Sequence, residues 1–64
     1  MPDRELVAQV DGSGPDSSAS ILIYRHGAQF EFVITEQKGG DASVFLEVEE
    51  ALKISTSLAA ALGK

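Results

Sequence analysis

The sequence of 64 residues predicts an α+β fold: a four-stranded antiparallel β-meander with one C-terminal helix packed on one face (β-β-β-β-α). Three observations predict it. Apolar and polar residues alternate through most of the chain, glycine-containing turns separate the alternating runs, and the apolar period becomes helical near the end. A chain of this length forms one domain over residues 1–64, and it buries only about 60% of the surface that its unfolded form exposes.

The central hairpin carries the clearest signal. Apolar residues occupy alternate positions on both sides of residues 26–27, where a glycine supplies the positive φ that a two-residue turn requires. With the turn placed there, Ile23 faces Phe30, and the other apolar pairs fall on the same side of the hairpin. We therefore predict strands at about 19–26 and 28–37.

The first strand is predicted at about 5–10. Its alternation places Leu6, Ala8 and Val10 on the face that meets the helix. The following stretch, residues 11–18, consists of glycine, proline and small polar residues, so we expect it to form a flexible loop.

The segment after the second glycine-containing turn has two interpretations: a long helix over residues 42–62, or a strand at about 43–48 followed by a helix at about 49–62. A long helix would put Glu47 within its apolar arc and Leu46 on its polar side. As a strand, the same residues alternate correctly. We therefore predict the strand.

The fourth strand also extends the apolar face of the sheet. An odd-numbered loop before it sets Ile34 opposite Leu46 and Phe32 opposite Val48. The helix that follows is expected to cross this face, because its apolar arc is wide. Acidic residues in its first turn and Gly63 after its last apolar residue define its ends.

The opposite face of the sheet is predicted to carry an apolar line across otherwise polar strands. Val7 and Leu22 are expected to be neighbours, Val33 and Phe45 continue the line, and Tyr24 lies at its margin. In so small a chain, such a line favours a protein–protein or self-association surface. The alternative is that strands simply favour such residues and that single exposed apolar side chains are normal.

Acidic residues concentrate at the predicted junction of the last strand and the helix, where Glu31, Glu47, Glu49 and Glu50 are expected to lie. This group is interpreted either as a docking strip for a basic protein or as a solubilising rim. The formal net charge of −5, from ten acidic and five basic residues, argues against direct nucleic-acid binding.

The sequence contains no catalytic constellation. His26 is predicted at an exposed turn, with no Ser, Cys or Asp placed to work with it. A calcium loop starting at Asp11 would need a bidentate Glu at its twelfth position, which is Leu22. There is no cysteine for a thiolate metal site. We therefore predict no enzyme activity, no cofactor and no metal.

These observations predict a small acidic, non-enzymatic protein-binding module that acts through its open sheet face and its acidic strand–helix junction. Two alternatives remain: a phage or mobile-element-type inhibitor (anti-CRISPR-like) that blocks a nucleic-acid-binding protein by acidic mimicry, and a structural or assembly homodimer subunit. The lack of cysteine, of a signal segment and of a membrane-length apolar run favours a cytoplasmic protein without membrane contact.

Overall fold

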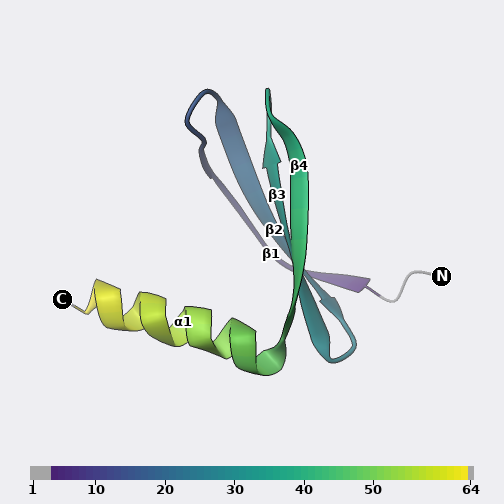
Figure 1. Cartoon of the computed structure of the whole chain (residues 1–64), viewed down its shortest axis with the longest axis vertical. Helices are drawn as coiled ribbons and strands as arrows, with labels where there is room; N and C mark the ends of the chain where they lie inside the picture. The colour runs from purple at the N-terminus through teal and green to yellow at the C-terminus, as the bar shows by residue number, and fades with distance from the viewer. Residues whose placement is uncertain (1–3, 64) are drawn as a thin grey trace.

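The computed structural model describes residues 4–63 and confirms the α+β architecture (Figure 1). Its elements are β1 (Arg4–Ser13), β2 (Ser18–His26), β3 (Gln29–Glu36), β4 (Gly40–Glu47) and α1 (Val48–Leu62). The four antiparallel strands form one sheet in the order β1-β2-β3-β4. Every strand therefore pairs with its neighbour in the chain, as a meander requires.

The hairpin of β2 and β3 turns one residue later than predicted, at residues 27–28. Gly27 has a φ of 59°, which suits the first central position of a type II′ turn. Ile23 consequently lies opposite Phe32 rather than Phe30, so the predicted register is wrong by two residues. Because this displacement is even, every side chain keeps its predicted face.

Replacing Gly27 with alanine should lower the free energy of unfolding by about 1–2 kcal/mol, since a left-handed backbone costs an L-residue about that much. Gly12 provides the matched control: it lies in β1, and a Cβ added there has no neighbouring atom within 4 Å. Gly12→Ala should not lower stability. Urea unfolding at equal protein concentration measures both variants, and an unchanged midpoint for Gly27→Ala would contradict the turn geometry.

The hairpin of β3 and β4, in contrast, closes earlier than predicted. Its loop is residues 37–39, and Gly40 takes the left-handed position with a φ of 87°. Ile34 therefore lies opposite Ala42 rather than Leu46, a displacement of four residues. The displacement is again even, so the apolar residues of β4 stay on the predicted face.

β1 differs most from the prediction. Leu6 lies opposite Tyr24 and Ala8 lies opposite Ile23, so the register shifts between them at a β-bulge. The bulge places Val7 among the residues that line the space next to the helix, while Leu6 joins the Tyr24 side. The predicted faces of Leu6 and Val7 are thus wrong, because an extra residue breaks the two-residue period.

Half of the predicted loop at residues 11–18 is strand. β1 continues to Ser13 and β2 begins at Ser18, which leaves only residues 14–17 as a connection. Across the two strands, the Ser20 hydroxyl donates a hydrogen bond to the Asp11 carboxylate at 2.8 Å. The small residues of this stretch therefore extend the sheet instead of interrupting it.

The helix boundaries agree with the prediction to one residue. Val48, predicted as the last residue of the fourth strand, is the first residue of α1. The Glu47 amide donates a hydrogen bond to the Glu50 carboxylate at 2.9 Å, which satisfies a free amide at the start of the helix. At the other end, the Gly63 amide donates to the Ala59 carbonyl at 3.0 Å.

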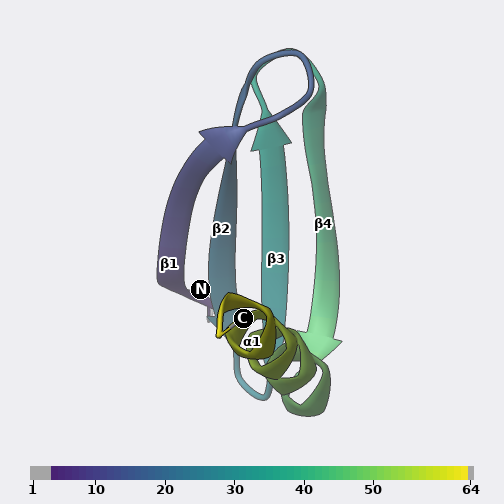
Figure 2. The ribbon, with the colours of Figure 1, turned by 90° about the vertical axis from the view of Figure 1, so that its left-hand side faces the viewer.

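We call the apolar side of the sheet the helix-side face and the other side the outer face. The helix-side face comprises Val7, Ala8, Val10, Ile21, Ile23, Phe30, Phe32, Ile34, Ala42, Val44 and Leu46. The N-terminal half of α1 packs against one end of this face, and its remainder projects away from the sheet (Figures 1 and 2). The helix therefore meets the predicted face, but the expectation that it crosses the whole of that face is wrong.

The result is an extended molecule. The Cα radius of gyration is 13.0 Å, about the value of a compact domain of 100 residues. Among residues 4–63, no apolar side chain is fully buried. The fold thus arranges its apolar residues on shared surfaces without enclosing them.

Candidate functional site

The half of the helix-side face that lies away from the helix is apolar and open. One residue from each of the four strands forms a row across this open half, Val10–Ile21–Ile34–Ala42, with Val10 60% and Ile34 49% exposed. Val44 of the edge strand β4 lies one row nearer the helix, opposite Phe32, and is 49% exposed. Figure 2 shows the helix at the lower end of the sheet and the strands extending above it. In a monomeric domain, another part of the fold normally covers the apolar face of a sheet, since apolar burial is the main favourable contribution to folding.

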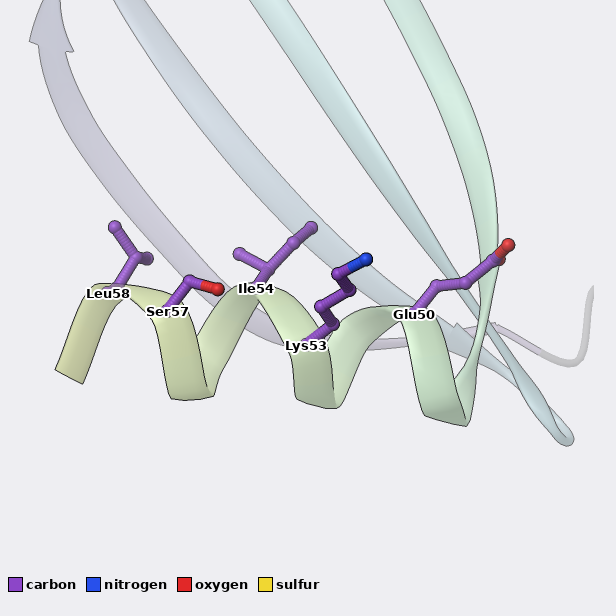
Figure 3. A pocket seen from close by; sticks show the side chains of 5 residues that line it. All are labelled: Glu50, Lys53, Ile54, Ser57 and Leu58. Atoms are coloured by element: carbon purple, nitrogen blue, oxygen red, sulfur yellow. The ribbon is translucent and has the colours of Figure 1, made fainter. Parts of the chain in front are cut away.

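A second apolar surface lies along α1. A groove of about 410 Å³ is lined by Glu50, Lys53, Ile54, Ser57 and Leu58, whose side chains extend from the helix beside the rising strands (Figure 3). Leu58 is 59% exposed, and Leu62 on the last turn is 86% exposed. The C-terminal half of the helix thus carries an apolar arc that no other part of residues 4–63 covers.

The two surfaces face each other across an angle, and a space of about 420 Å³ lies where they meet. Its lining comes from β1, β2, β3 and α1, and includes Val7, Phe32 and Leu52. We call the whole concave surface, made of the open half of the sheet face and the apolar arc of α1, the helix–sheet groove. It is a wide apolar recess that is open to solvent.

The chain as a whole exposes more surface than a compact monomer of its mass. The accessible surface is 5023 Å², whereas a compact monomer of 6.8 kDa exposes about 4,000 Å². The excess of about 1,000 Å² is close to the roughly 800 Å² that each partner buries in a standard protein–protein interface. The chain therefore carries one interface's worth of surface beyond what its size requires.

The outer face carries a local network of side chains. His26 Nε2 lies 2.7 Å from Glu31 Oε1, and its ring lies 5.2 Å from that of Phe45. The Arg4 guanidinium lies 4.0 Å from the centre of the Tyr24 ring and 3.6 Å from Glu31. His26 is therefore a half-buried residue at the end of β2, and not the exposed turn residue that the sequence predicts.

Three of the predicted site residues, Tyr24, Glu31 and Phe45, are brought together by this network. Leu22 and Val33 lie directly opposite each other in β2 and β3, and both are half-buried. The bulge removes Val7 to the other face, so the predicted apolar line lacks its first member. The outer face therefore carries the pair Leu22 and Val33, and also Leu6 and Phe45, which are 49% and 50% exposed beside the network of paired polar groups.

The predicted acidic group is divided by the structure. Glu31 belongs to the network on the outer face, whereas Glu50 accepts the hydrogen bond that caps α1. Glu47 accepts a hydrogen bond from the Gln29 amide at 2.6 Å, and Glu49 is exposed in the first helical turn. Three of these four carboxylates thus have local structural partners.

Replacing Glu31 with glutamine should lower the free energy of unfolding by about 1–2 kcal/mol. The variant loses the ion pair with Arg4 and the carboxylate hydrogen bond with His26, at a side chain that is only 12% exposed. Glu5→Gln is the control, since Glu5 is exposed in β1, and its effect should stay within about 0.5 kcal/mol. Equal losses in the two variants, measured by chemical unfolding, would argue against a stabilising network.

Sequence reasoning missed the groove, because it assigned Val10, Ile21, Ile34, Val44 and Leu58 to a covered core. Two signals pointed the other way: a chain of this length is short of buried surface, and the apolar arc of the helix is wider than a narrow sheet covers. Both signals indicate unpartnered apolar surface, and neither locates it.

Other kinds of site have less support. Among residues 4–63, no group of three or more His, Cys, Asp or Glu is arranged to hold a metal ion. The same residues include no helix with the length and apolar character that crossing a bilayer requires.

No family model, curated protein or solved structure matches the chain. Function is therefore inferred from the helix–sheet groove and the outer face.

Proposed function

We propose that this chain is a non-enzymatic protein-interaction domain whose contact surface is the helix–sheet groove. The observation that carries the proposal is that residues 4–63 combine a concave apolar surface with no fully buried apolar side chain, in a chain that exposes about 1,000 Å² more than a compact monomer of its mass. Folding of a small domain depends on apolar burial. A partner in the groove would supply the burial that the isolated chain lacks.

The groove has better support than the outer face as the contact surface. On the outer face, Tyr24, Glu31 and Phe45 already interact with neighbouring side chains. Acidic mimicry of a nucleic acid has less support for a similar reason, since Glu31 and Glu50 bond to groups of this chain. The predicted sites Leu22 and Val33 stay available for a secondary contact.

The proposal requires that the groove is open within each chain. Spin labels on Ser20→Cys in β2 and Ala60→Cys in α1 measure this, because the chain has no native cysteine. Dilution with excess unlabelled protein restricts the measured distance to labels in one chain. We expect the long separation of a projecting helix, as in Figure 1. A short separation, from a helix folded back along its own sheet, would close the groove and contradict the proposal.

A further inference from the structure

We infer that the occupant of the helix–sheet groove is a second copy of this chain. In this arrangement, the projecting half of α1 from each copy covers the open half of the helix-side face of the other. The inference rests on the proposed function, because it names the partner of the same surface. The size, the complementarity and the charge of the two surfaces support it.

The dimensions of the two surfaces are compatible. The projecting half of α1, about eight of its 15 residues, is about 12 Å long, and neighbouring strands lie about 4.8 Å apart. This half of the helix can therefore cover two to three strands of a neighbouring copy. The excess exposed area of about 1,000 Å² per chain also agrees with what a stable dimer buries on each side.

The two surfaces are also complementary within one sequence. The sheet offers an apolar face that needs a helix, represented by Ile34 and Val44, and the helix offers an apolar arc that needs a sheet, represented by Leu58 and Leu62. A two-fold axis brings each surface of one copy against the other surface of its mate. Both are then used at once, whereas a partner that supplied only a helix would leave Leu58 and Leu62 exposed.

Charge favours a second copy over a basic protein. The charged residues among those lining the groove along α1 are Glu50 and Lys53, which have opposite signs. The groove is therefore close to neutral, although the chain as a whole has a net charge of −5. Two such copies repel each other at long range, and salt screens this repulsion. Self-association should thus strengthen or stay constant as salt is added, while a basic partner would bind more weakly.

Analytical ultracentrifugation from about 1 to 200 µM, at 50 and 500 mM salt, tests the inference. The wild type should sediment with twice the chain mass of 6.8 kDa, without loss of association at high salt. Leu58→Glu should raise the dimer dissociation constant at least about 100-fold, because it buries an unpaired charge. Thr56→Glu, on the polar side of the same helix and outside the groove lining, should change the constant less than about threefold.

A cross-linking experiment tests the same contact without depending on the folding of Leu58→Glu. A mixture of Leu58→Cys chains and Ile34→Cys chains should form a disulfide-linked product that contains one of each under mild oxidation. A mixture of Ala60→Cys and Ile34→Cys chains should not. Failure of the first mixture to cross-link any better than the second would overturn the inference.

Other outcomes separate the two proposals. A wild type that stays a single chain at every concentration, with the long spin-label distance, would overturn the inference and leave an open groove for another protein. A single chain with the short distance would overturn both. A dimer that Leu58→Glu does not weaken would pair through sheet edges, and this too would overturn the inference.

Discussion

Replacing Val44 with glutamate should abolish the two-chain assembly and, at micromolar concentration, most of the folded protein. Val44 is about half exposed on the helix-side face. In an isolated chain, a carboxylate there would point into water and change stability by no more than about 0.5 kcal/mol. Under the helix of a second copy, the same carboxylate is buried without a partner, which costs several kcal/mol. Circular dichroism and sedimentation measure the two effects.

Ser43→Glu is the matched control for this variant. Ser43 is the preceding residue of β4, it is exposed, and its side chain points to the outer face. The two variants add the same charge to the same strand. A difference between them in assembly or stability therefore arises from the face on which the charge lies. We expect Ser43→Glu to assemble and unfold like the wild type. Equal behaviour of the two variants would contradict a covered helix-side face.

The thermal midpoint of the wild type should rise with protein concentration. For two chains that fold and associate together, each tenfold increase in concentration adds about 1.4 kcal/mol of stability per dimer. For a unit of this size, that corresponds to a rise of about 5 °C. Calorimetry at 5, 50 and 500 µM should therefore show a steady increase of about 10 °C in all.

A monomeric domain gives the opposite result, because its midpoint does not depend on concentration. Thr56→Ser is a suitable control for the series, since Thr56 lies on the polar side of α1 and the change is small. It should show the same slope as the wild type. A flat midpoint in both proteins would contradict coupled folding and association.

The faces of most strand residues could be predicted from the sequence, although the registers could not. Both hairpin registers differ from prediction by an even number of residues, so Ile34 keeps its face in either register. Side-chain alternation specifies the face, but turn geometry selects among registers that differ by two. Gly27 and Gly40, with their positive φ values, make that selection.

The bulge in β1 was beyond sequence reasoning for a physical reason. Leu6, Val7 and Ala8 are consecutive apolar residues, so either choice of face satisfies the alternation pattern locally. Only the pairing of Leu6 with Tyr24 shows that the period is broken. The Arg4–Tyr24 contact follows from this break, which is why the network on the outer face could not be predicted.

The helix illustrates the same limit at the next level. Its amphipathic pattern and acidic first turn specify where α1 begins and ends. The pattern also specifies which side of the helix is apolar, but not whether its own sheet or another molecule covers that side. The sequence pattern of Leu58 is that of a buried residue whether its own sheet or another molecule covers it. The sequence therefore indicates a buried arc, whereas in the structure Leu58 is 59% exposed.

Isotope-filtered NMR on a mixture of ¹³C-labelled and unlabelled chains tests the central claim most directly, because it detects only contacts between copies. The account predicts nuclear Overhauser effects from the Leu58 methyl groups of one copy to the Ile34 and Val44 methyl groups of the other. A mixture in which these methyl groups show no intermolecular effects, or contact each other only within a chain, would contradict it.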